Sequence, residues 1–325
     1  MRRAVLPLAW GALWLAVVTG AAWHWSATWF EAPGPHSTQI VTNLPKGASL
    51  SGIASRLRAA GAIQQPWLFV VNALLSGNAR KLKAGEYAIA PRASQRDILA
   101  QIAAGNIMLH AFTIPEGLSV AEILRRVAAA DELSGALPPP PPEGSMLPET
   151  YFFPRGESRA ALIGRLRISQ QALLDRVWAA RAAGLPLDSQ AQAVILASIV
   201  EKETGIAAER PQIAGVFYNR LALGMALQSD PTVVYARDKG EPNPKPLSGA
   251  DLAIDSPYNT YTNPGLPPGP IANPGRAALE AVLRPAATDA LYFVADGTGG
   301  HVFSASLIEH NKNVAKLRAR ERAKP

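Results

Sequence analysis

The stretch A-V-I-L-A-S-I-V-E-K-E-T occupies Ala193–Thr204 in the second half of the 325-residue chain. Its first part is almost wholly apolar, and it ends abruptly in Glu201, Lys202 and Glu203. An apolar segment of this length favours a buried helix. Burial raises the pKa of a glutamate, so a carboxyl group at the end of such a helix can stay protonated near neutral pH. The stretch therefore predicts a buried helix that delivers an acid to the segments around its end.

Two glutamates compete for this role. Glu203 continues the stripe of Ile195 and Ile199, whereas Glu201 lies over smaller side chains that leave room for a ligand. Periodicity does not decide between them. Either one is equally compatible with a solvated glutamate at a helix end that pairs with a nearby Lys or Arg.

Polar and aromatic motifs follow this helix in the sequence. They are F-Y-N-R (Phe217–Arg220), L-Q-S-D-P-T (Leu227–Thr232), Y-N-T-Y (Tyr258–Tyr261) and G-L-P-P-G (Gly265–Gly269). An acid followed by such groups is what chemistry on a sugar requires. The glycine- and proline-rich motif is expected to shape a rigid loop.

Individual side chains of these motifs are candidates for binding. Gln228 and Asp230 are expected to hydrogen-bond sugar hydroxyls or an acetamido group, or else Asp230 caps a helix or turn. Tyr258, Asn259 and Tyr261 are candidates for stacking faces and donors, the alternative being a tyrosine-rich loop packed on the core.

Three further residues are expected to support the site. Asn219 and Arg220 would anchor the loop by hydrogen bonding. Glu203, if Glu201 is the acid, would position it or tune its charge.

Several classes of chemistry lack their signatures. The chain has no cysteine, and G-x-S-x-G, H-E-x-x-H and G-x-x-x-x-G-K-[ST] are missing. The five histidines have no metal-ligand spacing, so neither a metal nor a cofactor is expected. The net charge of +7 comes mostly from scattered arginines without a recognition motif, so nucleic acid is not an expected partner.

The N-terminus predicts a membrane anchor. Ala4–Phe30 contains no Asp, Glu, Lys or Arg, and a helix of this length reaches roughly 40 Å, more than the hydrocarbon core of a bilayer. Arg2 and Arg3 precede it, which places the N-terminus in the cytoplasm and the rest of the chain outside. Trp23, Trp25 and Trp29 fit an interfacial aromatic belt on the outer side. A cleaved signal peptide is the alternative.

The rest of the chain predicts an α+β protein with two globular parts. Residues 31–38 are expected to be a linker, and 39–115 a small α/β module with the order strand, helix, helix, strand, helix. Residues 116–143 are expected to connect the parts through a helix and the five-proline run of 138–142. Residues 144–325 predict a larger, mostly helical domain that contains a β-hairpin near 291–303.

Taken together, these motifs resemble the membrane-bound endolytic murein transglycosylases, the YceG-like family. The resemblance extends to G-L-P-P-G-P-I, L-Y-F-V-A-D-G, the terminal H-N-K (His310–Lys312) and E-G-S-M-L-P-E-T-Y (Glu143–Tyr151), in order along the exported region. The small module, with L-P-K-G-A-S-L-S-G-I-A and K-A-G-E-Y, is similar to a LysM-like glycan-binding unit. A spacer that holds the larger domain off the membrane is the alternative for that module.

The resemblance implies a function. It assigns the catalytic acid to the first Glu of E-K-E-T, which is Glu201 here. That residue would protonate the oxygen between N-acetylmuramic acid and N-acetylglucosamine and then deprotonate the muramyl 6-hydroxyl, giving a 1,6-anhydro end without water. Nascent peptidoglycan strands would be cut internally, which limits their elongation.

Other functions remain open at this point. The competing enzyme is a hydrolytic muramidase with the same acid, and the competing non-enzyme is a glycan-binding or scaffolding protein. The resemblance also implies a single-pass protein of the inner membrane that contacts peptidoglycan and penicillin-binding proteins or other cell-wall synthases.

Overall fold

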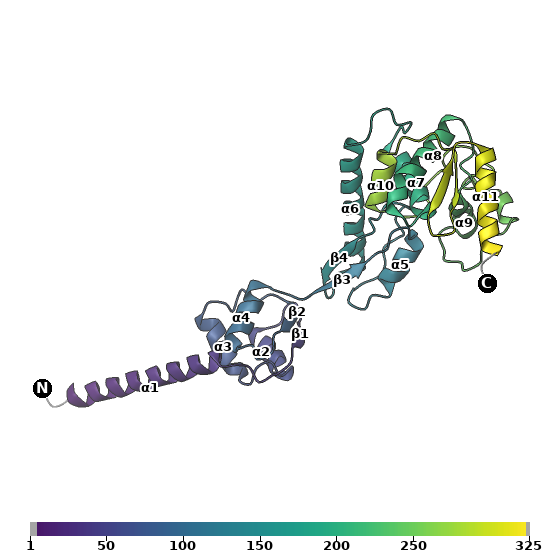
Figure 1. Cartoon of the computed structure of the whole chain (residues 1–325). Helices are drawn as coiled ribbons and strands as arrows, with labels where there is room; N and C mark the ends of the chain where they lie inside the picture. Colours follow the sequence, from purple (N-terminus) through teal and green to yellow (C-terminus); the bar gives the residue numbers. More distant parts are fainter. Residues whose placement is uncertain (1–4, 323–325) are drawn as a thin grey trace. The chain divides into compact units, whose positions relative to one another are not determined.

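The computed structural model describes residues 5–322, although the side chains of residues 5–9 and 12 are excluded from the description. The chain forms two compact units. The first extends to His110 and also contains Phe152–Arg155, and the second comprises Ala111–Tyr151 and the chain from Gly156 onward. Figure 1 shows both units, with labels on the helices and on strands β1–β4.

The first unit is built on a two-stranded antiparallel sheet. Strand β1 (Ile40–Leu44) pairs with β2 (Gly85–Ile89), with Ile40 opposite Ile89. Helices α2 (Leu50–Ala59), α3 (Pro66–Leu75) and α4 (Gln95–Ala104) complete the unit with α1. Its core contains Leu57, Phe69, Tyr87, Ile98 and Ile102. The predicted order of strand, helix, helix, strand and helix is confirmed.

Serine caps fix where two of these helices begin. The Ser49 side chain accepts a hydrogen bond from the Gly52 amide, and Ser94 forms a capping box with Asp97. Such caps satisfy amide groups that have no partner within the helix.

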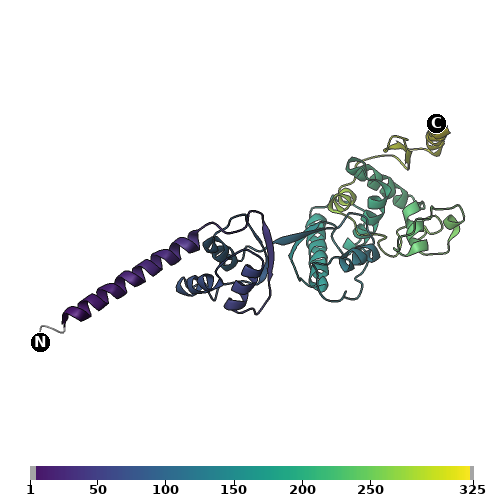
Figure 2. The ribbon, with the colours of Figure 1, turned by 90° about the horizontal axis from the view of Figure 1, so that it is seen from below.

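Helix α1 (Val5–Glu31) covers most of the predicted anchor and forms an uninterrupted rod (Figure 2). Within the described part of the chain, no helix combines the length and the apolar character that crossing a membrane requires. Arg2 and Arg3, on which the predicted orientation depends, lie outside the described residues.

The segment predicted as a linker, residues 31–38, is held against the first unit. His36 Nε2 lies 2.8 Å from the Ala90 carbonyl oxygen, and the Arg92 amide donates to the His36 carbonyl at 2.9 Å. The Gly34 amide in turn donates to the Arg92 carbonyl at 3.0 Å. These contacts join the segment to the loop between β2 and α4.

A second two-stranded sheet consists of β3 (Leu109–Thr113) and β4 (Thr150–Pro154). The sequence predicts a strand that starts at Phe112–Ile114, whereas β3 begins already at Leu109. Strand β4 was not predicted, because its short aromatic run lies inside a motif with many turn-forming residues.

The second unit is mostly helical and is centred on α7 (Gln190–Glu203). Every residue from Ala193 to Glu201 is buried, so the predicted buried helix is confirmed. Helices α6 (Arg159–Ala179), α8 (Arg210–Ala222) and α10 (Arg276–Leu283) pack against it. The remaining elements are α5 (Val120–Ala128), α9 (Asp230–Asp238), α11 (Leu307–Arg322) and the predicted hairpin of β5 (Tyr292–Ala295) and β6 (His301–Ser304).

Three features of this unit differ from the sequence-based expectation. The sequence predicts a helix over Arg159–Gly184, but α6 ends at Ala179, because the chain turns there and the Ala182 amide donates to the Leu283 carbonyl at 2.9 Å. Helix α9 begins in L-Q-S-D-P-T, where Pro231 is compatible with the first turn of a helix. Helix α10 was also not predicted.

Residues 116–143 belong to the second unit and do not merely connect two domains. The Gly117 amide donates to the Asn273 carbonyl at 3.1 Å, and the Asn273 amide donates to the Leu118 carbonyl at 2.9 Å. The five-proline run of 138–142 forms neither helix nor strand.

Candidate active site

The two glutamates at the end of α7 point in nearly opposite directions. An α-helix turns by about 100° per residue, so Glu201 and Glu203 are about 200° apart around its axis. They therefore contact different sets of residues, which can be described separately.

Glu201 lies in a buried ion pair. Its Oε1 is 2.6 Å from Nη2 of Arg210, and its Oε2 accepts the Gly275 amide at 2.9 Å. Only 3% of the Glu201 side chain is exposed, and Arg210 also contacts Glu116 at 3.2 Å. Burial raises the pKa of Glu201, while the Gly275 amide and the Arg210 charge oppose this shift. The carboxylate thereby joins the end of α7 to the beginnings of α8 and α10.

Glu203 lies beside a cavity of about 400 Å³, which we call the catalytic cavity. Its Oε1 accepts a hydrogen bond from the Ser229 hydroxyl. Burial raises the pKa of Glu203 to about 7, and the negative charge of Asp230 acts in the same direction. The Ser229 hydrogen bond and the positive charges of His301 and Arg220 oppose this rise. A substantial fraction of this carboxyl group is thus protonated at neutral pH.

Several predicted site residues meet Glu203 in the catalytic cavity. Gln228, Asp230, Tyr261 and Arg220 all line it, and they come from three motifs. Asp230 Oδ1 accepts the Tyr261 hydroxyl at 2.6 Å. This bond gives both side chains a defined orientation at the cavity wall.

Gln228 is held in an unusual backbone conformation. Its φ is +53°, in the left-handed region that non-glycine residues seldom adopt, and its amide donates to the Thr260 carbonyl at 3.1 Å. Such strain is typical of functional sites, where the surrounding structure maintains it.

A hydroxyl network fixes the start of α9 next to Glu203. The Ser229 amide donates to Thr260 Oγ1 at 3.0 Å, and Thr232 Oγ1 lies 2.8 Å from the same oxygen. All three residues are buried. The network joins L-Q-S-D-P-T to Y-N-T-Y, two motifs far apart in the sequence.

Arg220 both lines the cavity and holds its walls together. Its Nε donates to the Leu291 carbonyl at 2.6 Å, its Nη1 donates to the Leu227 carbonyl at 2.8 Å, and its guanidinium lies 5.2 Å from the centre of the Tyr292 ring. Burial lowers the pKa of Arg220. Asn219 donates to the carbonyl oxygens of Thr288 and Ala290, at 2.9 and 3.0 Å, and so anchors the chain before β5.

Tyr258 and Asn259 do not line the catalytic cavity. Asn259 is fully buried and donates to the carbonyl oxygens of Leu252 and Ile254. The Tyr258 ring packs 4.9 Å from that of Tyr235. A Cβ atom on Gly269 would lie 2.7 Å from the Tyr258 hydroxyl, so a side chain there would displace this hydroxyl. Both side chains shape the loop that carries Tyr261.

The structure adds residues that sequence reasoning did not select. Ser229, Tyr292, His310 and Asn311 lie at Glu203 or line the cavity. His310 stacks on Tyr292 at 5.2 Å, and burial lowers its pKa. Three of them belong to L-Y-F-V-A-D-G and H-N-K, but nothing in the spacing of these motifs indicated that they approach Glu203.

The sequence that forms this polar and aromatic cavity is similar to sequences of known proteins. The model of the YceG-like family matches residues 42–316. The chain belongs to the YceG-like family. A relative from Bacillus subtilis (strain 168), named endolytic murein transglycosylase, is 33% identical over 307 residues, which is 85% of this chain and 84% of the relative.

Two further relatives extend this comparison. An endolytic murein transglycosylase of Streptococcus pneumoniae serotype 2 is 30% identical over 323 residues, and the match spans 58% of that protein's length. A solved structure of a putative yceG-like protein from Listeria monocytogenes is 32% identical, with a TM-score of 0.56. That match covers 84% of this chain and 98% of the other. This YceG-like protein therefore shares its fold with a crystallised relative.

Proposed function

We propose that this protein is an endolytic murein transglycosylase and that Glu203 is its general acid and base. The observation that carries the assignment is a glutamate with a pKa of about 7 beside a cavity lined by Gln228, Asp230 and Tyr261. The names of relatives at 30% and 33% identity support the same activity.

Glu203 has the properties that the reaction requires. Protonated Glu203 gives its proton to the glycosidic oxygen between N-acetylmuramic acid and N-acetylglucosamine as the C1–O bond breaks. The resulting carboxylate then accepts the proton of the muramyl 6-hydroxyl, whose oxygen bonds to C1 and forms the 1,6-anhydro ring. No water is consumed, and the Ser229 hydroxyl keeps the carboxyl oriented in both steps.

Glu201 is less suited to this exchange. Both of its oxygens already accept hydrogen bonds from the protein, from Arg210 and Gly275. The Arg210 charge at 2.6 Å favours its ionised form. We therefore propose a supporting role for Glu201, which fixes the end of α7 that carries Glu203.

Asp230 makes hydrolysis the alternative reaction, because it is a second carboxylate in the same cavity. An inverting hydrolase uses a second carboxylate to activate water. The Tyr261 hydroxyl occupies one Asp230 oxygen at 2.6 Å, which fits a binding role better than that of a base.

Product analysis tests the proposal. Purified full-length protein is incubated with murein, and the fragments are identified by mass spectrometry. We expect muramic acid in its 1,6-anhydro form, internal cuts that leave shorter strands, and about 10³-fold slower product formation by the Glu203→Gln variant. Reducing ends without the anhydro form would instead indicate a hydrolytic muramidase.

We also propose that the first unit lies at the cytoplasmic membrane and that the second unit lies outside the cytoplasm. Helix α1 is uncharged from Val5 to Phe30, and Trp25 of α1 stacks on Trp67 of α3 at 6.2 Å. Trp67, Leu74 and Leu75 form an exposed apolar surface on α3. Exposed Arg80 and Lys81 follow it, and apolar surface beside positive charge suits an anionic lipid interface.

A probe attached to α3 tests this location. The chain has no cysteine, so Leu74→Cys creates a single labelling site, and Ser55→Cys on α2 is the matched exposed control. In vesicles of phosphatidylethanolamine and phosphatidylglycerol, spin-labelled lipid should quench a fluorophore at position 74 but not at 55. Equal quenching at both positions, or at neither, would contradict the contact.

The order β1–α2–α3–β2 supports a further proposal, that the first unit is a LysM-like module that binds glycan. Retention of murein by the full-length Glu203→Gln protein would measure this binding without cleavage. Contact with penicillin-binding proteins stays a prediction from the resemblance.

A further inference from the structure

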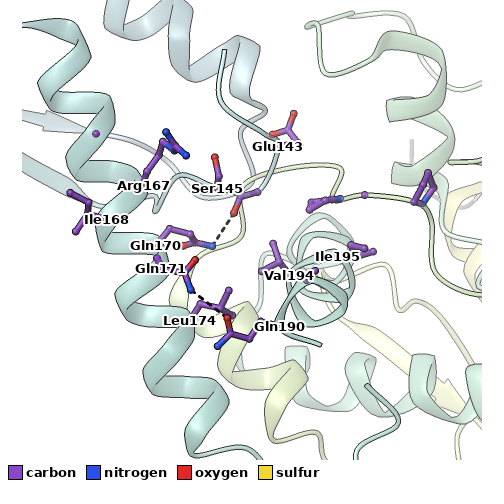
Figure 3. Close-up of a pocket in the computed structure, with 16 residues that line it drawn as sticks. Glu143, Ser145, Arg167, Ile168, Gln170, Gln171, Leu174, Gln190, Val194 and Ile195 are labelled. Atoms are coloured by element: carbon purple, nitrogen blue, oxygen red, sulfur yellow. Dashed lines mark hydrogen bonds between the residues drawn. The ribbon is translucent and has the colours of Figure 1, made fainter. Parts of the chain in front are cut away.

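A second and larger pocket of the second unit lies between α6 and α7. Its volume is about 820 Å³, and the segments 143–145 and 268–270 close its sides (Figure 3). We call it the α6–α7 pocket. It shares no lining residue with the catalytic cavity, and its size is that of a small-molecule or short-peptide site.

A buried acceptor without a partner lines the α6–α7 pocket. Only 3% of Gln170 is exposed, and its Nε2 donates to the Gly144 carbonyl at 3.1 Å. Its Oε1 is buried and has no hydrogen-bond partner among the described residues. Leaving a buried acceptor unsatisfied is unfavourable, so this oxygen suits a ligand that brings an N–H group.

Charged and amide groups surround this acceptor. Exposed Arg167 lines the pocket, and no carboxylate of residues 5–322 lies within ion-pair distance of it. At another edge, Gln171 and Gln190 donate to Asp175 Oδ1 at 2.8 and 3.0 Å. The pocket thus offers a cation for a carboxylate and further amide oxygens for N–H donors.

The walls of the pocket favour a peptide over a sugar. They are aliphatic, with Leu174, Val194 and Ile195 among them, and no aromatic residue lines the pocket. Pyranose rings pack their C–H faces on aromatic rings, which the catalytic cavity offers in Tyr261 and Tyr292. Short apolar side chains need only aliphatic walls.

The α6–α7 pocket lies at a distance from Glu203 that a side branch of a glycan polymer, attached near the cleaved bond, could span. Ile195 lines the pocket and Glu203 lines the catalytic cavity, and both belong to α7. Eight residues of helix separate them, which corresponds to roughly 12 Å along its axis. A branch of the same polymer can therefore occupy one site while the glycosidic bond occupies the other.

We propose that the α6–α7 pocket binds the peptide stem of murein while its glycan backbone occupies the catalytic cavity. The proposal rests on the proposed function for the identity of the polymer. The stem's amide N–H groups would satisfy Gln170, its carboxylates would pair with Arg167, and its methyl side chains would pack on the aliphatic wall.

Gly164 provides a variant that fills the pocket without harming the fold. It lies inside α6 and lines the pocket, and a Cβ atom there would meet nothing within 4 Å. Gly164→Trp should occupy the pocket, and Gly164→Ala is the matched control. Because glycine is unfavourable within a helix, neither change should lower the melting temperature.

The substrates for the test are stem-bearing glycan strands and the same strands after an amidase has removed the stems. We expect Gly164→Trp to lower kcat/KM on stem-bearing strands about tenfold and to leave peptide-free strands unaffected. Gly164→Ala should match wild type on both. Equal rates for Gly164→Trp and wild type on stem-bearing strands would overturn the proposal, as would an equal loss on both substrates.

A binding measurement keeps this inference separate from the proposed function. A synthetic stem peptide ending in D-Ala-D-Ala is titrated into the full-length protein and followed by line broadening of its NMR signals. Wild type should bind, Gly164→Trp should not, and Arg167→Gln should bind about tenfold more weakly. If wild type makes no anhydro product, the proposed function fails, yet this titration still decides the role of the pocket.

Discussion

Glu201 and Glu203 end the same helix only two residues apart, yet their side chains have different partners and different access to a cavity. Glu201 pairs with Arg210 at 2.6 Å and accepts a backbone amide, so its charge is neutralised within the protein. Glu203 accepts one hydroxyl group and lies at a cavity, where burial raises its pKa to about 7. Burial raises the pKa of both glutamates, but only Glu203 lines a cavity that a substrate can enter, so the difference teaches that burial alone does not make a catalytic acid.

The largest expected effect is on kcat, which should fall much further when Glu203 is replaced than when Glu201 is replaced. Glu203→Gln should lower kcat about 10³-fold, because it removes the proton that the leaving oxygen needs. Glu201→Gln keeps an acceptor oxygen for only one of its two donors, Arg210 or the Gly275 amide, but leaves the Glu203 proton in place and should change kcat of the folded protein by less than about tenfold. Initial rates of anhydro-product formation measure both. The reverse order of effects would restore Glu201 as the catalytic acid.

The stability of the folded protein should depend on the ion pair between Glu201 and Arg210. Arg210→Met leaves Glu201 buried without its counter-charge and should lower the free energy of unfolding by about 3 to 5 kcal/mol. Denaturant titration of the full-length protein measures this loss. Arg276→Met breaks the half-exposed contact with Glu149 and is the control, with an expected loss below about 1 kcal/mol.

A double variant sharpens that measurement. Glu201→Met combined with Arg210→Met replaces the ion pair by apolar side chains and should recover most of the lost stability. No recovery would indicate that Arg210 stabilises the protein mainly through contacts other than the one with Glu201.

The pH dependence of activity and of stability should reflect the ionisation of the Glu203 carboxyl group. Activity requires its protonated form, so kcat/KM should fall as the pH rises through about 7. The raised pKa of Glu203 also makes stability depend on pH. Between about pH 4.5 and 7 the folded state binds more protons than the unfolded state. The stability that protonated Glu203 contributes is therefore lost as the pH rises through this range. Glu203→Gln should flatten this part of the stability profile. An alkaline fall in activity that begins far from pH 7 would contradict the assignment.

The smallest expected effect concerns the Ser229 hydroxyl, which lowers the pKa of Glu203 by donating to it. Ser229→Ala should therefore move the alkaline fall in activity to higher pH by less than about one unit. Ser248→Ala removes a serine donor from Asp251, away from the cavity, and should leave the profile unchanged. A shift to lower pH in Ser229→Ala would contradict the hydrogen bond.

The local elements were largely predictable, because their signals are local. Ser49 and Ser94 mark helix starts by satisfying free amides, and the apolar run of Ala193–Val200 identifies a buried helix. The sequence left the start of α9 undecided, because the turn-forming residues of L-Q-S-D-P-T are compatible with either a loop or a helix start. Tertiary contacts chose between these two states.

By itself, the sequence determined that this chain carries a buried helix with two terminal glutamates and an ordered set of polar motifs, from which the family resemblance follows. Only the tertiary structure decided what each glutamate faces. Their partners, Arg210, Gly275 and Ser229, come from α8, the start of α10 and the start of α9. Helical periodicity states that the two side chains diverge, but the pKa of each depends on groups brought close by packing. For the same reason, Tyr258 and Asn259 support the loop while Tyr261 reaches the cavity.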